Sequence, residues 1–278
     1  MIQLPDDEIL DGIERCCIGT FMRCSRVVPH CTVFEGPDIV GFQMGLASPM
    51  ANMILGTYLT DEDVSARVAE VLELHRAKEI PMLWWTGPSS KPPTLGETLV
   101  NLGAHSIMDT PGMAAPFTPE NTTLQPIPGF ELREVGPEDD ELWADTCLEI
   151  FNMSPELRTV FGPPLVDRSQ RKTHPMVKFL GLLDGKAVAT SSYSVIDDVL
   201  GIFCVATHES ARGMGIGSEM TKAPMAAGQE LGCRYGVLQA SPMGLSVYEK
   251  LGFKTYGSFQ RYLYNPLLLD SAESEAVA

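Results

Sequence analysis

The chain has 278 residues, 44% of them hydrophobic and 20% charged, which predicts one large or two medium domains with packed cores. Its 20 basic side chains stand against 36 acidic ones, so the net charge is −16 at pH 7. Such a surface repels phosphate backbones and anionic lipid, and we expect neither nucleic acid nor a membrane as a partner. It would steer a cationic amine favourably, although excess acid also serves solubility alone.

No apolar run reaches the length of a membrane span, and the acidic start of the chain, 1–11, lacks the features of a signal peptide. We therefore expect a cytoplasmic protein. The seven cysteines are odd in number and show neither CxxC nor Cys/His ligand spacing. This pattern favours free thiols in a reducing compartment and predicts no bound metal.

The first region alternates strand and helix signals. Residues 38–59 hold strand-like stretches, 64–78 an amphipathic helix, 81–86 a strand and 94–102 a short helix. Thr60 is a good N-cap for the longer helix, and the three acids that follow it suit the positive end of the helix dipole.

A stretch rich in Pro, Gly and Thr, 110–129, separates this region from the next and is the best boundary candidate. We expect a degenerate first domain over 1–120 and a second domain over 128–266. The last residues combine small side chains with three acids, so 267–278 are expected to form a disordered acidic tail.

The second region predicts the element order β-α-α-β-β-β-α-β-α-β. Pro137 opens a helix with an acidic first turn, and the Asp-Gly pair at 184–185 is typical of a hairpin turn. Pro224 falls inside a later helix and should kink it or remove a hydrogen bond. In chain order we expect a strand over 130–135, helices over 137–152 and from 154 to 161, strands over 177–183, 187–196 and 199–207, a helix over 215–231, a strand over 234–240, a helix over 243–251 and strands over 253–264.

Directly after the strand at 199–207, residues 212–218 read Arg-Gly-Met-Gly-Ile-Gly-Ser. Alternate glycines let the backbone approach a ligand closely, and a helix that begins there adds unpaired N–H groups and its positive dipole end. This combination predicts an anion site, usually for a phosphate or pyrophosphate. A P-loop is disfavoured because no lysine follows Gly217, and the G-x-G-x-x-G spacing of a dinucleotide site is not completed.

The two regions share a layout, and Leu102-Gly103 near the end of the first parallels Leu251-Gly252 in the second. Two diverged copies of one unit are therefore plausible. They differ where the main helix begins, because the first copy has Thr60 followed by three acids where the second has the glycine loop. Those acids fill the anion position with negative charge, so we expect only the second copy to bind a pyrophosphate.

Two motifs of the second region resemble the GNAT superfamily of acyl-CoA-dependent N-acyltransferases. The family's Q/R-x-x-G-x-G/A motif at a strand-to-helix turn is matched by Arg212 to Gly217, and its Tyr-x-x-x-Gly-Phe motif by Tyr248 to Phe253. The resemblance covers 130–266 and extends weakly to the first region. It implies an α/β protein with the tandem acyl-CoA N-acyltransferase (GNAT) fold. In this fold a mixed central sheet is flanked by helices, and the N-terminal copy is expected to be degenerate.

By this resemblance, the backbone of the glycine loop would hold the pyrophosphate of coenzyme A. The end of the preceding strand would pair with the amides of the pantetheine arm, as an added strand would. A serine stands at 241, where many relatives carry an asparagine near the cofactor. The residues so implied in cofactor binding are Val205, Ala206, Thr207, Arg212, Gly213, Met214, Gly215, Ile216, Gly217, Ser218 and Ser241.

Tyr248 is the implied general acid, because an amine that attacks a thioester releases a thiolate and a phenol within reach can protonate it. A thiol nucleophile at Cys204 has no evident partner histidine, and core packing explains that residue better. The base is not identified, since relay through water would need no single residue. The candidate bases are Glu149, His174, Asp197, Asp198, His208 and Glu209.

The function implied is transfer of an acetyl group from acetyl-CoA, a co-substrate, to a primary amine in a ternary complex without a metal. Polyamines, amino acids, antibiotic amines and protein N-termini all remain open as acceptors. We expect a monomer or a homodimer. One alternative is a non-catalytic acyl-CoA sensor or regulatory module, and another is a purely structural or interaction protein.

Overall fold

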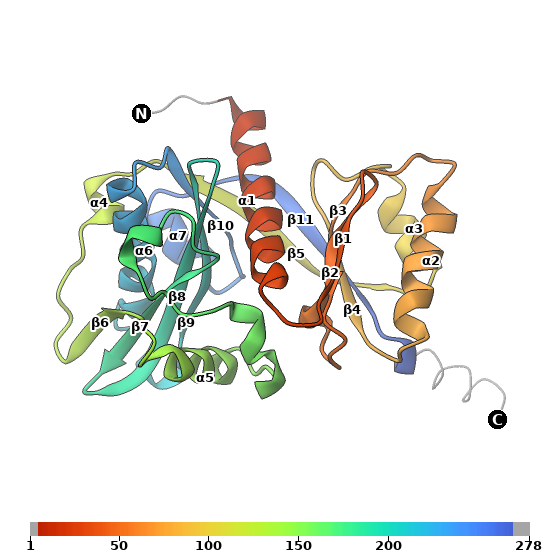
Figure 1. The fold of residues 1–278 in the computed structure, drawn as a ribbon. Coiled ribbons are helices and arrows are strands. Elements are labelled where there is room, and N and C mark those ends of the chain that lie inside the picture. Colours follow the sequence, from red (N-terminus) through yellow and green to blue (C-terminus); the bar gives the residue numbers. More distant parts are fainter. Residues whose placement is uncertain (1–4, 269–278) are drawn as a thin grey trace. The chain divides into compact units, whose positions relative to one another are not determined.

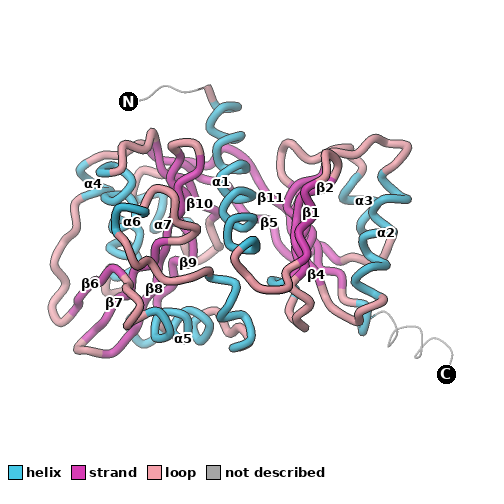
Figure 2. The backbone as a smooth tube through the Cα atoms, viewed as in Figure 1, coloured by secondary structure: helices cyan, strands magenta, loops and turns pink. Residues whose placement is uncertain are grey.

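The computed structural model describes residues 5–268, which fall into two compact units of discontinuous sequence. Of the described residues, 5–27 and 111–257 form unit 1, and 28–110 and 258–268 form unit 2. Two long strands, β5 (His105–Ala115) and β11 (Lys254–Tyr264), each contribute one end to either unit. Figure 1 shows the course of the chain, and Figure 2 shows its helices and strands.

The sheet of unit 1 has the strand order β5-β10-β9-β8-β7-β6. β9 and β10 are parallel, and every other neighbouring pair in this order is antiparallel. The turns at 184–185 and 197–198 connect β7 to β8 and β8 to β9. All four turn residues have positive φ, which matches the twist of a tight hairpin. The strands are β6 (Phe130–Glu134), β7 (Val177–Leu183), β8 (Lys186–Ile196), β9 (Val199–Thr207) and β10 (Tyr235–Gln239).

Helices cover both faces of this sheet (Figure 1). Phe179 and Tyr193 belong to one core cluster with Met220 of α6 (Ile216–Glu230). The residues that alternate with them face the other way, where α1 (Asp6–Arg26) and α5 (Asp140–Ile150) pack. Pro224 lies inside α6, which continues through it to Glu230. The remaining short elements are α4 (Pro119–Thr122), α7 (Leu245–Lys250), η2 (Pro155–Phe161), η3 (Arg168–Gln170) and η4 (Glu209–Ala211).

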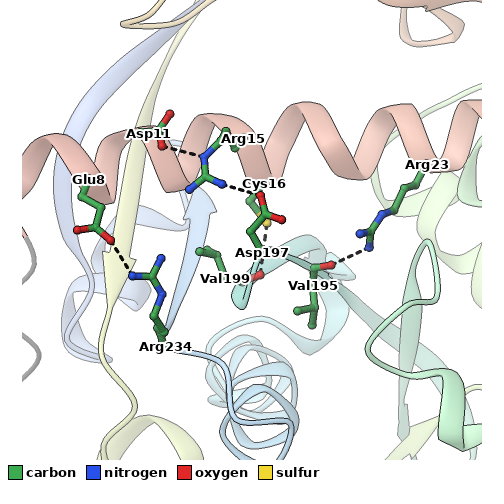
Figure 3. A network of polar contacts seen from close by, with 9 residues as sticks. All are labelled: Glu8, Asp11, Arg15, Cys16, Arg23, Val195, Asp197, Val199 and Arg234. Carbon is green, nitrogen blue, oxygen red and sulfur yellow. Dashed lines mark hydrogen bonds and ion pairs between the residues drawn. The ribbon is translucent and has the colours of Figure 1, made fainter.

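Helix α1 was not expected from the sequence, and it lies against β8, β9 and β10. Two glycines make the close approach possible, because a Cβ on Gly12 would meet the Tyr235 hydroxyl at 2.1 Å and one on Gly19 would meet Ile196 at 3.0 Å. Arg15 reaches Asp197 of the β8–β9 turn at 2.6 Å. Figure 3 shows how these and further polar contacts join the helix to the strands beneath it.

In unit 2 the strands follow the order β1-β2-β3-β4-β11, and only the β3–β4 pair is parallel. The helices α2 (Val64–Arg76) and α3 (Leu95–Asn101) bury their apolar sides with Ile54, Trp84 and Tyr262 in a second core cluster. The strands are β1 (Thr32–Glu35), β2 (Ile39–Gln43), β3 (Asn52–Thr57) and β4 (Met82–Thr86), and η1 (Pro49–Ala51) precedes β3.

The compact units differ in their boundaries from the expected segments 1–120 and 128–266. Residues 1–27 group with 111–257 because α1 buries one side on the sheet of unit 1. The stretch 110–129, expected as a linker, contains the end of β5 and the helix α4. That the two segments are copies of one unit stays a prediction. Of the expected tail, 269–278 lie outside the described residues.

Candidate functional site

The loop that follows β9 has a conformation that depends on glycine at two positions. Gly213 has a φ of 80° and Gly215 a φ of 83°, in the left-handed region that other residues adopt only with strain. Gly217 lies in the first turn of α6, and a Cβ there would meet only Thr207 Oγ1, at 3.6 Å. The fold would therefore tolerate a side chain at 217, and a ligand lying against the loop would account for the glycine.

Most N–H groups of this loop are available to a ligand. Within the described part of the chain, we find no acceptor for the N–H groups of residues 213–217. The Ser218 N–H, in contrast, donates to the Gly215 carbonyl at 3.0 Å, so it is closed within the turn. Ile216 has a buried side chain that anchors the loop in the core, whereas Met214 is exposed. Open donors at the positive end of a 15-residue helix are an arrangement that favours an anion, and the binding of one here stays a prediction.

The acid nearest this helix start is neutralised by its neighbours. One carboxylate oxygen of Glu219 accepts from Lys222 Nζ at 2.8 Å, and the other accepts from the Gln125 N–H at 2.7 Å. At the edge of the loop, Arg212 is exposed, and Glu209 of η4 is exposed three residues before it. The anion site would therefore depend on the backbone N–H groups and the helix end rather than on net side-chain charge.

The pairing between β9 and β10 ends before the strands do. Their parallel register joins residues 199–201 to 235–237, whereas β9 continues to Thr207. On its other side β10 pairs with β5 over 236–239, so only its pairing with β9 stops at 237. Residues 202–207 of β9 therefore leave an open edge on the side away from β8. The resemblance implied that this strand end pairs with a ligand, and that pairing stays a prediction.

Thr207 presents its backbone to this open edge. Thr207 pairs with Ala189, and the next N–H along β9, that of His208, donates to the Val188 carbonyl at 2.8 Å. In this register the N–H and carbonyl of Thr207 point away from β8. The Thr207 carbonyl accepts from Arg212 Nε at 3.2 Å, so the open edge meets the glycine loop. Ala206, in contrast, is buried and paired with Thr190.

A β-bulge interrupts β9 shortly before this end. The register to β8 shifts between Thr190 and Ser192, and Cys204 takes a φ of 53°. Thr190 Oγ1 donates to the Cys204 carbonyl at 2.9 Å. Val205, the next residue, packs its side chain against the core. Bulges redirect a strand, and this one lies where β9 is no longer paired with β10.

Tyr248 lies on α7 with only 7% of its surface exposed. Its ring contacts Phe253 edge to face at a centroid distance of 6.0 Å, and it belongs to the same core cluster as Ile216 of the glycine loop. Burial raises the pKa of Tyr248 to about 12, so the phenol keeps its proton near neutral pH. Ser241 is exposed, and its hydroxyl accepts from the Gly244 N–H at 3.2 Å just before α7.

The candidate bases fall at two ends of the unit. Asp197 and Asp198 lie in the turn before β9, so the whole strand separates them from the glycine loop. Asp197 forms an ion pair with Arg15, and Asp198 forms one with Lys172. Beside the other end of β9, His208 Nε2 faces Glu149 Oε1 at 4.0 Å. Glu209 is exposed in η4, which follows β9. His174 is buried, and burial lowers its pKa.

Two aromatic residues next to the bulge are in contact, which the sequence did not predict. Phe21 of α1 and Phe203 of β9 are half-buried and meet edge to face at 6.0 Å. The Phe203 ring also lies over Gly201, where a Cβ would meet it at 2.7 Å. Alternation along β9 predicts that Phe203 points to the opposite face of the sheet from the core residue Ile202. No local pattern in the sequence indicates that α1 covers that face.

The start of α2 in unit 2 is preceded by an acidic turn. Thr60 Oγ1 accepts from the Asp63 N–H at 3.2 Å and donates to the Asp63 carboxylate at 2.7 Å. Thr94 Oγ1 contacts the Asp61 carboxylate at 3.3 Å. Thr60 was expected as the N-cap, but α2 begins at Val64, so Asp63 takes the N-cap position, and its side chain makes no capping hydrogen bond. The acids expected before this helix are present, whereas glycines precede α6.

Two further searches of the described residues, 5–268, gave negative results. No group of three or more His, Cys, Asp or Glu side chains there is placed to hold a metal ion. None of the helices in that range is both long and apolar enough to cross a membrane. The absence of a metal in the reaction and a cytoplasmic location stay predictions.

Comparison with known proteins identifies the segment that carries this site. Residues 143–253 match the sequence profile of the acetyltransferase (GNAT) family. This segment contains β9, the glycine loop, α6 and Tyr248. A comparison with curated protein sequences found no match.

Solved structures share the fold over nearly the whole chain at low sequence identity. A GCN5-related N-acetyltransferase from Kribbella flavida has a TM-score of 0.63 at 17% identity, over 91% of this chain and 95% of that one. A tandem GNAT protein from the clavulanic acid biosynthesis pathway has a TM-score of 0.60 at 16% identity, over 94% and 96%. A conserved protein of unknown function from Staphylococcus epidermidis has a TM-score of 0.60 at 12% identity, over 86% and 96%. The predicted GNAT fold is thus confirmed.

Proposed function

We propose, from the membership of residues 143–253 in the acetyltransferase (GNAT) family, that the protein moves an acetyl group from acetyl-CoA to a primary amine. The observation that carries this proposal is the set of open N–H groups at 213–217, next to the open edge of β9. An anion site joined to an unpaired strand end fits a ligand with a pyrophosphate and an amide-containing arm. Coenzyme A has both.

The fit can be stated group by group. The N–H groups of the glycine loop would bind the pyrophosphate, and such charge-assisted hydrogen bonds contribute about 1.5–3 kcal/mol each. Thr207 would pair with the pantetheine arm through its backbone, as a strand does when it adds to a sheet edge. Gly217 leaves room for the phosphates. The Ser218 N–H is already bonded in the turn, so its part would be limited to its hydroxyl.

Tyr248 would supply the proton in the chemical step. A neutral amine attacks the thioester carbonyl carbon, the C–S bond breaks, and the thiolate that leaves takes the phenolic proton. The phenol of Tyr248 is protonated at the pH where the amine attacks, as the role requires. Its raised pKa makes it a weaker acid than an exposed phenol, so the support for the role is its place in the matched motif. The amine proton passes to water or to His208, the candidate base that faces Glu149 beside the end of β9.

The test is a panel of primary amines incubated with acetyl-CoA, with release of free thiol as the readout and the affinity for coenzyme A measured alongside. The panel contains a polyamine, amino acids, an aminoglycoside and a peptide with a free N-terminus. We expect thiol release with at least one class. Tight binding without release over the whole panel would favour the alternative, a non-catalytic acyl-CoA sensor. A ligand of the folded state raises Tm by mass action, so an unchanged Tm with acetyl-CoA would leave a structural protein.

A further inference from the structure

The segment before β6 is attached to the surroundings of the glycine loop at several points. We call residues 116–129 the strap; the sequence predicted them as part of a linker, and all of them lie in unit 1. In Figure 1 the strap runs from α4 along the side of unit 1 to the start of β6. A passive linker makes few fixed contacts with the domain beside it, so the contacts of the strap require another explanation.

The first part of the strap is held by a buried amide. Asn121 of α4 is 1% exposed, and its side-chain nitrogen donates to the Leu251 carbonyl at 3.1 Å and to the Pro116 carbonyl at 2.9 Å. Its side-chain oxygen accepts from the Thr118 N–H at 3.0 Å. Leu251 directly follows α7, the helix that carries Tyr248. Both ends of the amide are thus hydrogen-bonded, and they fix the strap against the end of α7.

The last part of the strap is held through its backbone. The Phe130 N–H donates to the Ile127 carbonyl at 3.0 Å, and the Asp184 N–H donates to the Gly129 carbonyl at 2.8 Å. These bonds place Ile127 beside the glycine loop, where a Cβ on Gly215 would lie 3.8 Å from Ile127 Cδ1. The strap therefore covers one side of the loop.

Glu219 joins the middle of the strap to the glycine loop. Its backbone N–H donates to the Gly215 carbonyl at 3.3 Å, and its carboxylate accepts from the Gln125 N–H at 2.7 Å. The other carboxylate oxygen accepts from Lys222 Nζ at 2.8 Å, and the side chains of this ion pair are only 6% and 11% exposed. Because both oxygens are held, the carboxylate cannot turn toward the open N–H groups of 213–217, where it would compete with an anion.

We propose that Glu219 is a positioning residue for coenzyme A binding, which holds the strap and the glycine loop in one arrangement. This role rests on the proposed function. The carboxylate fixes the strap through the Gln125 N–H, and the strap places Ile127 against Gly215. A loop that is ordered before binding costs the ligand less entropy. Loss of the contact should therefore weaken binding through the pyrophosphate and leave the pantetheine arm, at the open edge of β9, unaffected.

The most informative variant is Glu219→Gln. A carboxylate has two accepting oxygens, whereas an amide has one accepting oxygen and a nitrogen that only donates. The new side chain therefore cannot accept from both the Gln125 N–H and Lys222 Nζ. In the double variant Glu219→Gln/Lys222→Met the ammonium is gone, and the amide oxygen can accept from the Gln125 N–H again. Ile127→Ala leaves the ion pair intact and tests the strap even where Glu219→Gln does not fold.

The experiment compares the affinities of the full-length protein for coenzyme A and for pantetheine, which lacks the phosphates, by titration calorimetry. In Glu219→Gln we expect coenzyme A to bind about tenfold more weakly, a usual size for coupling between two positions, and pantetheine to bind as before. Ile127→Ala should change the two affinities in the same way, and the double variant should recover most of the loss. Hydrogen exchange at the Gln125 amide should become faster in Glu219→Gln and slow again in the double variant.

The matched control is Asp140→Asn. It removes the charge that faces another buried lysine of unit 1, Lys178, whose Nζ lies 2.7 Å from the Asp140 carboxylate. This variant should lower Tm and leave both affinities unchanged. It therefore separates the loss of a buried ion pair in general from the loss of the contact with the strap.

Three results would overturn the positioning role. One is an unchanged affinity for coenzyme A in Glu219→Gln and Ile127→Ala. Another is an equal loss of affinity for coenzyme A and pantetheine, which a general structural defect would cause. The third is a double variant as weak as Glu219→Gln, because the ion pair alone would then explain the loss. If the unchanged protein does not bind coenzyme A at all, the proposed function itself fails, and exchange at the Gln125 amide shows that Glu219 holds the strap for structure alone.

Discussion

Each unit contains one pair of parallel strands, and the two pairs end differently. In unit 1, β9 runs past its pairing with β10 and leaves an open edge at Thr207. In unit 2, β3 also runs past its pairing with β4, which joins residues 53–54 to 83–84. There the chain itself fills the edge: the Lys91 N–H donates to the Thr57 carbonyl at 2.9 Å, and the Leu59 N–H donates to the Lys91 carbonyl at 3.2 Å.

The closure in unit 2 shows what kind of ligand the edge of unit 1 suits. Lys91 pairs with the strand as a parallel bridge, through one N–H and one carbonyl, and the indole of Trp84 donates to Thr57 Oγ1 at 2.9 Å. An extended backbone segment is therefore a stable occupant of such a strand end. In unit 1 the described residues provide no such segment at this edge, and the pantetheine amides offer the same donor and acceptor pattern.

A second contrast concerns the residue that stands four positions before the glycine of each Leu-Gly pair, Leu102-Gly103 and Leu251-Gly252. Tyr248 stands four residues before Gly252, and Leu99 stands four residues before Gly103. Leu99 is fully buried, and it carries no proton to donate. In the described residues of unit 2, the positions that correspond to the glycine loop, the open edge and Tyr248 hold acids, a strand end bridged by Lys91, and Leu99.

The largest expected effect is a loss of turnover when a tyrosine of unit 1, but not one of unit 2, is replaced by phenylalanine. Tyr248→Phe should lower turnover by ~10²–10⁴-fold while coenzyme A binding is kept, because only the proton donor is removed. The assay is thiol release under saturating acetyl-CoA, paired with calorimetric binding. The matched control is Tyr262→Phe in unit 2, which should leave turnover unchanged. Full activity of Tyr248→Phe would refute its assignment as the acid.

The next largest effect is on coenzyme A binding, which should depend on the start of α6 and not on the start of α2. Gly217→Val should weaken coenzyme A binding by about 10–100-fold, the equivalent of about one lost charge-assisted hydrogen bond. The fold should persist, since only Thr207 Oγ1 lies near the new side chain. Ser65→Val changes the same position of α2, the second helical residue, and should have no effect on binding. Equal affinities for both variants would contradict a pyrophosphate site at the loop.

Binding stoichiometry tests the comparison directly. We expect one coenzyme A per chain, because the edge of β3 is occupied by Lys91 and three acids precede α2. Isothermal titration with the full-length protein gives the number. Two equivalent sites per chain would show that the closure in unit 2 opens in solution and would reverse the interpretation of that unit.

A smaller effect concerns stability alone. Trp84→Phe removes the hydrogen bond to Thr57 and some buried ring volume, and should lower the free energy of unfolding by about 1–3 kcal/mol. Turnover at saturating substrate should stay at the level of the unchanged protein, since Trp84 belongs to unit 2. Denaturant titration and the thiol-release assay measure the two quantities. A large fall in turnover of the folded variant would mean that unit 2 takes part in catalysis.

The smallest expected effect is a flat pH profile on the alkaline side. Tyr248 has a pKa of about 12 in the folded protein, raised by burial from an ordinary value of 10.0. The phenol therefore stays protonated up to about pH 10, and kcat should not decline below that pH on its account. By linkage, its contribution to stability is present below about pH 10 and is lost as the pH rises through about 12. A decline of kcat that is absent from Tyr248→Phe and has its midpoint near pH 10 would contradict the shift.

Local chemistry explains which parts of unit 1 were predictable. The Asp-Gly turn at 184–185, the alternation of β7 to β9 and the glycines at 213 and 215 each restrict the backbone through their own residues, and the elements from β6 to α7 follow the expected order. Tyr248 was found through its motif. Its burial and raised pKa could not be read from the sequence, because they depend on the packing of Phe253 and α6 around it.

Other features depend on contacts between distant residues. The segment 6–26 has glycines at 12 and 19 and four cysteines or serines along its buried side, so its helical pattern is weak. The glycines are explained only by Tyr235 and Ile196, which lie far along the chain. Lys91 closes the edge of unit 2 through its backbone alone, and no side-chain pattern reports such a contact. β5 was hidden because Pro111 reads as a break, although its carbonyl accepts from the Ala240 N–H.

Helix α1 also bears on how the chain reaches its final state. Asp197, to which Arg15 is joined, is synthesised 182 residues after it (Figure 3). Arg234, the partner of Glu8, follows Glu8 by 226 residues. The helix must therefore remain undocked, with its apolar side accessible, until these residues have been made. A fragment that lacks α1 would leave this side of the sheet in unit 1 uncovered.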